Sequence, residues 1–129
     1  MLRGTFTGIN FETHRGKILK AGASAGTVAL ATNSATETSC GVAVDFLPAV
    51  ATTGTVGSAG VELGLVGTAG LTAGFHKLTF DASSRLASAV QGESLVNCVG
   101  WVFARRAYAA GEWIEFNVDL GMSPIEAAE

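Results

Sequence analysis

The sequence predicts a single all-β domain, built as a small barrel or sandwich of short strands. Apolar or alternating runs recur along the chain, separated by turns rich in Gly, Ser and Asp, which is typical of such folds. Gly and β-branched residues interrupt nearly every window that could form a helix, and both lower helix propensity. A chain of 129 residues is long enough to bury one core without disulfides or metals.

Runs with strand character follow one another from residue 17 onward. In chain order, the predicted strands are residues 17–21, 27–31, 41–46, 60–66, 75–80, 85–90, 96–104 and 112–120. The last run is the clearest, because Trp113 and Glu115 alternate with Ile114 and Phe116. This period of two places one face of the strand in the core and the other toward solvent or a partner.

Turn chemistry joins several of these runs. Residues 81–84 have the sequence Asp-Ala-Ser-Ser, and Asp and Ser side chains hydrogen-bond to nearby backbone in turns. Residues 109–111, Ala-Ala-Gly, close a predicted hairpin. Residues 52–60 are rich in Gly, Thr and Ser and are predicted to form a long loop.

A weak internal repeat relates two parts of the chain. Residues 40–46 resemble residues 98–103, and each copy leads through a loop to a short strand, at 61–63 or 114–116. We interpret the copies as two strand–loop–strand units of one sheet system. Each copy begins with a cysteine, and we expect Cys40 and Cys98 to be buried free thiols at equivalent positions, because two isolated cysteines make neither a disulfide framework nor a zinc site.

The net charge of −3 is unevenly distributed. Residues 1–20 contain four basic side chains against Glu12 alone, which gives +3, whereas the rest of the chain carries −6. We interpret residues 1–20 as a basic arm that reaches an acidic partner, with ordinary scatter of charges as the alternative. The acidic balance argues against nucleic acid as a partner. A polar segment follows Met1, so no secretory signal is expected, and no apolar stretch approaches the roughly 18 residues that a membrane helix requires.

The sharpest candidate for catalysis is the run Gly-Ala-Ser-Ala-Gly at residues 22–26. It matches the G-x-S-x-G nucleophile elbow, and Asp45 and His76 follow in the order serine, acid, histidine. An elbow needs a strand before it and a helix after it, whereas the residues after Gly26 are strand-like. We therefore interpret the run as a tight hairpin turn around Ser24.

The two histidines also lack a catalytic or metal-binding context. Neither His14 nor His76 lies within metal-ligand spacing of a Cys, another His or a pair of carboxylates. We predict no catalytic residue, no cofactor and no metal site, and we do not expect an enzyme. His76 is expected at the surface or between subunits.

Large and charged side chains near the C-terminal strands are candidates for a protein interface. Trp113 falls on the polar face of its predicted strand, and outward tryptophans dominate interface hot spots; packing under a loop is the alternative. Arg105 and Arg106 lie beside Tyr108 in a predicted loop, a combination that suits a carboxylate-bearing partner. The alternative for these two arginines is a solvated loop.

The polar face of residues 112–120 also allows a carbohydrate-binding site. Trp113 would supply the aromatic platform, with Glu115, Asn117 and Asp119 on the same face of the strand. Glycan binding that is lost in Trp113→Ala would support this alternative.

Taken together, residues 60–121 resemble the phage head decoration proteins, which comprise the lambda-type decoration protein and related small capsid cement proteins. The segments that carry the resemblance are residues 70–74, the strand and turn Leu-Thr-Phe-Asp-Ala-Ser-Ser-Arg-Leu at 78–86, Val-Gly-Trp-Val at 99–102, and Trp-Ile-Glu-Phe at 113–116, ending at Gly121. The resemblance covers about half of the chain. The longer first repeat, with residues 52–60, departs from the lambda type.

The resemblance implies a β-barrel or β-tulip fold for residues 21–121, an N-terminal arm at residues 1–20 and a C-terminal tail at residues 122–129. It implies a homotrimer, made in the host cytoplasm, that binds the major capsid protein on the outer surface of the mature virion and clamps neighbouring capsid subunits. The capsid-binding residues would be those of the arm, namely Arg3, Phe6, Phe11, Arg15, Lys17 and Lys20. A tail or head-joining β-module of a virion is the alternative.

Overall fold

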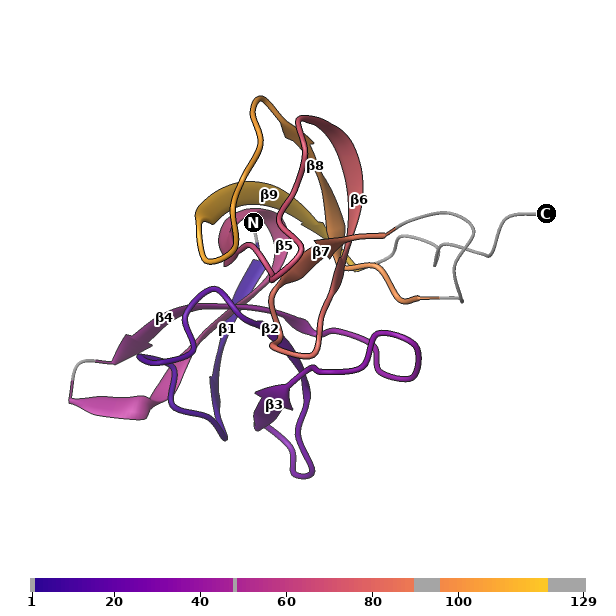
Figure 1. Cartoon of the computed structure of the whole chain (residues 1–129). Coiled ribbons are helices and arrows are strands. Elements are labelled where there is room, and N and C mark those ends of the chain that lie inside the picture. The colour runs from indigo at the N-terminus through magenta and orange to yellow at the C-terminus, as the bar shows by residue number, and fades with distance from the viewer. Residues whose placement is uncertain (1, 48, 90–95, 121–129) are drawn as a thin grey trace.

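The computed structural model describes residues 2–47, 49–89 and 96–120 (Figure 1). These residues form strands and no helix, which confirms the all-β prediction. The strands are β1 (Leu2–Thr7), β2 (Ile18–Ala21), β3 (Val28–Leu30), β4 (Gly41–Leu47), β5 (Val50–Leu65), β6 (Gly74–Phe80), β7 (Leu86–Ser88), β8 (Gly100–Ala104) and β9 (Trp113–Asp119). The predicted C-terminal tail, residues 122–129, lies outside the described residues.

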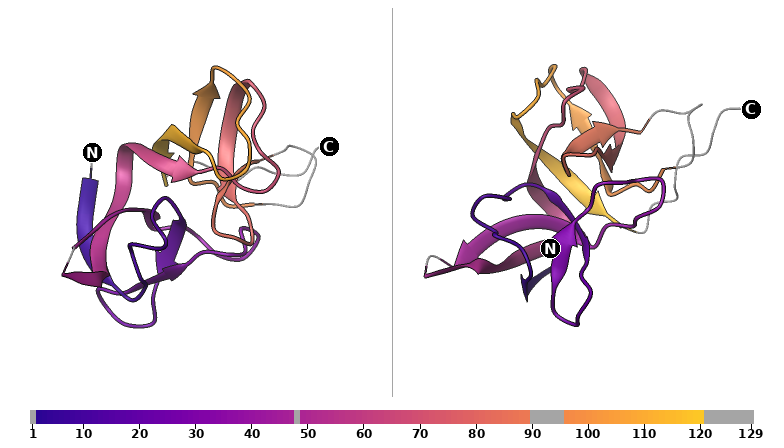
Figure 2. Two further views of the ribbon diagram at one scale, coloured as in Figure 1. Left: turned by 60° about the vertical axis from the view of Figure 1, so that its left-hand side comes forward. Right: turned by 60° about the horizontal axis from the view of Figure 1, so that its bottom comes forward.

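All the strands belong to one antiparallel, strongly curled sheet that forms half of a barrel (Figure 2). The strand order is β3-β2-β4-β5-β9-β8-β6-β7, and β1 pairs with β5 beside this path. β5 connects the two ends of the molecule, because its first half pairs with β4 and β1 and its second half pairs with β9.

The predicted loop at residues 52–60 is instead part of β5, which is 16 residues long. Its glycines allow other side chains to pack closely against the backbone of the strand, and they do not make the segment a loop. A Cβ on Gly54 would lie 2.5 Å from Cδ2 of Phe11, and a Cβ on Gly57 would lie 2.8 Å from Cδ of Glu62. The side chains of Phe11 and of Glu62, the latter in β5 itself, therefore occupy the space that side chains at these positions would fill. The β-branched residues between the two glycines keep the strand extended.

Residues 2–20 are part of the folded domain, and they correct the prediction of an extended N-terminal arm. β1 pairs with residues 53–59 of β5, and β2 runs across the predicted boundary at residue 20. Phe11 is completely buried, and so is Leu19. The basic charge of this segment suggested an arm, but its apolar side chains complete a core.

The core consists of two clusters that share β2 and β4. The larger cluster includes Ile18 and Val42, and the smaller one, centred on Phe11, includes Leu19 and Ala43. Neighbouring residues on one strand point to opposite faces, so β2 and β4 are covered on both sides. This explains why two consecutive residues are buried and apolar in each strand, Ile18 and Leu19 in β2 and Val42 and Ala43 in β4.

Neither cysteine forms a disulfide, as predicted. Cys98 is buried, whereas Cys40 is only partly buried and packs against the smaller cluster. Burial raises the pKa of the Cys40 thiol, which keeps it protonated and unreactive.

The predicted turn at residues 81–84 is confirmed and is organised by Asp81. The carboxylate of Asp81 accepts hydrogen bonds from the hydroxyl and backbone N–H of Ser83, and from the backbone N–H of Arg85 and Thr68. Partial burial opposes ionisation of Asp81, but these hydrogen bonds outweigh it and lower the pKa of the carboxyl. The turn thereby fixes the start of β7.

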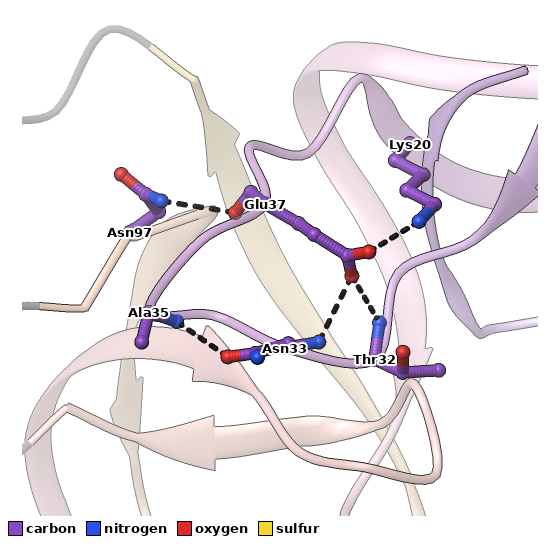
Figure 3. Close-up of polar contacts among 6 residues, drawn as sticks. All are labelled: Lys20, Thr32, Asn33, Ala35, Glu37 and Asn97. Carbon is purple, nitrogen blue, oxygen red and sulfur yellow. Dashed lines mark hydrogen bonds and ion pairs between the residues drawn. The ribbon is translucent and has the colours of Figure 1, made fainter.

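Glu37 organises the long connection between β3 and β4 (Figure 3). Its carboxylate pairs with Lys20 and accepts hydrogen bonds from the backbone N–H of Thr32 at 2.8 Å and of Asn33 at 2.9 Å. Its own carbonyl accepts a hydrogen bond from the side-chain amide of Asn97 at 2.9 Å. One glutamate thus ties this connection to β2 and to the segment that precedes β8.

Replacing Glu37 with glutamine is expected to weaken the acid dependence of stability. The hydrogen bond with Lys20, followed by those from Thr32 and Asn33, lowers the pKa of Glu37 from 4.5 to about 2. A lowered pKa in the folded state contributes stability that is complete above pH 4.5 and is lost as the pH falls toward 2. Thermal unfolding between pH 5 and pH 2 should therefore show a shallower slope in Glu37→Gln. Glu12→Gln, at an exposed position, is the control, and equal slopes in Glu37→Gln and the parent would refute the assignment.

Candidate functional site

β5 and β9 pair in a register that turns apolar side chains of β5 outward. Leu63 is 48% exposed and lies opposite Glu115, whereas Glu62 between Val61 and Leu63 is only 4% exposed. On β9 the apolar residues Ile114 and Phe116 are buried and Glu115 is exposed, which is the opposite arrangement. The two copies of the predicted repeat are therefore neighbours in one sheet, but their corresponding residues face opposite sides.

β6 and β8 extend this outward apolar surface. Phe103 is 67% exposed and pairs across the strands with Phe75, which is 58% exposed. The ring of Phe75 stacks on Trp101 with 6.0 Å between ring centroids. Aromatic rings this exposed on adjacent strands form a surface rather than a core.

Together these side chains define what we call the outer face. It consists of Val61, Leu63, Phe75, Trp101, Phe103 and Trp113, from the adjacent strands β5, β9, β8 and β6. Its four aromatic residues alone expose about 400 Å² if each has about 200 Å² in total. Contiguous apolar patches of this size on soluble domains commonly mark interaction sites.

Two hollows lie on this face and share Leu63, Trp113 and Glu115. The larger, about 660 Å³, extends toward Asp45 and Arg15. The smaller, about 380 Å³, extends toward β8. Trp113 thus lines both hollows.

One part of the Trp113 ring packs against the protein, and the other part is exposed to solvent. It is 45% exposed, and a Cβ on Gly16 would lie 2.8 Å from Cη2 of its ring. Gly16 has a φ of 79° and carries no side chain, so its backbone leaves room for one part of the ring. The predicted outward position of Trp113 is confirmed, and the ring is held against the segment that precedes β2.

The predicted capsid-binding residues do not form one surface. Phe11 is in the smaller core cluster and Phe6 packs against it, while Lys20 is paired with Glu37. Arg15 is exposed and lines the larger hollow, where its Nε lies 3.4 Å from the carbonyl of Val44. Lys17 is half-buried, and Arg3 is in β1 opposite Gly57.

The predicted interface residues near β8 lie in two neighbouring places, and Tyr108 belongs to both. Arg106 pairs with Glu112 at 2.8 Å and lies 4.0 Å from the ring centre of Tyr108. These contacts are all within one hairpin, and they raise the pKa of Arg106, chiefly through the hydrogen bond to Glu112. Arg105 lines the smaller hollow together with Tyr108 and Trp113.

Sequence reasoning missed five of the six residues of the outer face, namely Val61, Leu63, Phe75, Trp101 and Phe103. In β8 the pattern was hidden because both faces of the strand are apolar, with Trp101 and Phe103 outside and Val102 inside. The unusual bulk of these two rings beside the small Gly100 and Ala104 is the one signal that could have revealed them.

Residues 22–26, which match the G-x-S-x-G pattern, lie in the turn between β2 and β3, as the hairpin interpretation requires. Ser24 accepts a hydrogen bond at its carbonyl from the hydroxyl of Thr27 at 2.6 Å. His76 bonds instead to the hydroxyl of Ser88 at 2.8 Å, and Asp45 is in β4. Within residues 2–47, 49–89 and 96–120, no group of three His, Cys, Asp or Glu side chains is placed to hold a metal ion.

A scan against protein-family models finds no match, and a search of curated proteins finds no similar sequence. The part of the chain that the structure describes contains no helix long and apolar enough to cross a membrane. The geometry of the outer face is therefore the main basis for a functional assignment.

Proposed function

We propose that this chain is a structural virion protein that binds the outer surface of a mature phage capsid as a homotrimer. It stabilises the shell by clamping neighbouring subunits of the major capsid protein. The observation that carries this proposal is the outer face, whose large apolar side chains lie uncovered on four adjacent strands. Such a surface suits a protein that works in contact with other protein surfaces.

The capsid as the particular partner is supported by the resemblance to the decoration proteins. The Asp-x-x-Ser-Arg-like segment of that resemblance forms a rigid turn around Asp81. The half-barrel curl of the sheet is compatible with the barrel or tulip architecture that the resemblance implies, and we propose that architecture for the assembled protein.

β1 offers a way to engage capsid strands without a free arm. Among the described residues, its backbone hydrogen bonds go to β5 on one side and, from Thr7, to Gly26. A strand added to the remaining edge would gain main-chain hydrogen bonds. Arg3, Arg15 and Lys17 supply positive charge in this part of the chain, so an acidic capsid segment is the expected partner.

The protein is expected to sediment with mature capsids that lack it, up to a fixed ratio, and to raise the temperature at which those capsids open, because binding one state stabilises that state. Precursor shells of the same virus should not retain it. Arg3→Glu, in β1, should weaken binding several-fold at low salt with an unchanged melting temperature, whereas Glu12→Gln should bind as the parent does. Absence of sedimentation with mature capsids, or equal retention by precursor shells, would refute the proposal.

A carbohydrate-binding module is the second candidate, and the larger hollow favours it. Trp113 lies there beside Glu115, Asp45 and Arg15, a set of aromatic and charged groups suited to a sugar ring. Asn117 and Asp119, which the sequence grouped with this site, do not line the hollow. Retention on glycans that Trp113→Ala abolishes would favour this candidate over the capsid.

A further inference from the structure

The outer face is divided into two halves by a split in the sheet. β8 and β9 pair only at Gly100–Val118 and Trp101–Asn117, although β8 pairs with β6 as far as Ala104 and β9 pairs with β5 as far as Trp113. Beyond Trp101 the two strands diverge, and the smaller hollow opens between them. The sheet is also strongly curled (Figure 2), so we consider the two halves as separate docking surfaces.

The two halves differ in shape. The β6–β8 half carries Phe75 and Phe103, the two most exposed large apolar side chains among the described residues. The β5–β9 half carries Val61 and Leu63, which line the larger hollow beside Trp113. One half therefore projects aromatic rings, and the other provides a recess of about 660 Å³ lined by both apolar and charged side chains.

The two halves also differ in charge. Lys77 lies beside Trp101 on the β6–β8 half, and Arg105 follows β8 at the end of the same half. On the β5–β9 half, Glu115 and Asp45 line the recess, with Arg15 also lining it. The projecting half is basic, and the recessed half has an excess of carboxylates.

We propose that the β6–β8 half of one copy of this chain docks onto the β5–β9 half of the next copy, in a head-to-tail contact that closes into a ring. A second copy fits because shape and charge are complementary between two surfaces of the same molecule. Two different surfaces in contact make a heterologous interface, which generates a ring when the rotation closes. This contact deepens the homotrimer of the proposed function and rests on that proposal only for the number of copies, and it leaves the edge of β1 free for the capsid.

Light scattering on a size-exclusion column tests the contact with the full chain and two double variants. Phe75→Ser with Phe103→Ser disables the projecting half, and Val61→Ser with Leu63→Ser disables the recess. All four side chains are exposed, so both variants should keep the circular dichroism spectrum of the parent. The parent is expected to have the mass of a ring of three or more copies, and each variant alone should be a monomer.

A one-to-one mixture of the two variants is the decisive sample. It contains one intact projecting half and one intact recess for each pair of chains, so it should form a dimer and nothing larger. A mixture that stays monomeric, a variant that keeps the mass of the parent, or a parent that is a monomer or a dimer would overturn the inference. A monomeric parent that still sediments with mature capsids would refute this contact alone, whereas rings that do not sediment would refute only the capsid proposal.

Discussion

Replacing Phe11 with alanine is expected to lower the free energy of unfolding by about 3–5 kcal/mol. The Phe11 ring has no exposed surface, and it packs in the smaller core cluster with Leu19 and Val56. It also fills the space above Gly54, where a Cβ would lie 2.5 Å from Cδ2 of the ring. Alanine would leave a cavity under β5 that its extended, hydrogen-bonded backbone cannot close, and urea-induced unfolding measures the loss.

The same variant tests where the N-terminal segment belongs. Glu12→Ala is the matched control, since it truncates an exposed neighbour, and it should change the free energy of unfolding by less than about 0.5 kcal/mol. If Phe11→Ala were as stable as this control, residues 2–20 would act as the arm that the charge pattern suggested, and the smaller core cluster would not contribute to folding.

Gly100→Ala is expected to destabilise the protein by about 3 kcal/mol, at the upper end of the usual cost of overpacking. A Cβ at this position would overlap the carbonyl oxygen of Asn117 and lie 2.9 Å from its carbonyl carbon. This obstacle is backbone, so no side-chain rotation can relieve it. Gly100 is also one of only two residues through which β8 pairs with β9 among the described residues, and the substitution should therefore detach the two strands.

The measurement is urea-induced unfolding together with amide exchange in β8 and β9. Gly4→Ala is the matched control, because the atoms nearest to its Cβ would be those of the Phe6 ring, at 3.4 Å or more. Faster exchange confined to β8 and β9 in Gly100→Ala would agree with the proposed detachment. Equal stability of the two alanine variants would show that β8 and β9 are not held together at Gly100.

The strand content of the chain was predictable because it depends on local properties. Apolar and polar residues alternate strictly from Ile114 to Asp119, and in β9 the apolar members are buried while the polar ones are exposed or partly exposed. The turn at residues 81–84 was predictable for the same reason, since Asp81 bonds mainly to residues within four positions of itself. Turn chemistry and a period of two act over distances that a sequence shows directly.

The sequence did not allow us to predict that the Gly-rich segment 52–60 is part of a strand and not a loop. Glycine permits a flexible loop and close packing equally well. Which of the two forms depends on whether a large side chain from a distant part of the sequence packs against the glycine. Phe11 does so at Gly54, which is 43 positions away along the chain. The same long-range contact brings the N-terminal segment into the fold.

Which strands form, and where several turns lie, is determined by the sequence itself, because backbone propensity and side-chain alternation are local. Which face of each strand is buried depends on the tertiary structure, because a shift of one residue in register exchanges the two faces. Val61 and Leu63 show this most clearly, since the pairing of β5 with β9 turns them outward and Glu62 inward. The outer face, and with it the candidate docking surface, exists only because the curled sheet brings β5, β9, β8 and β6 side by side in that register.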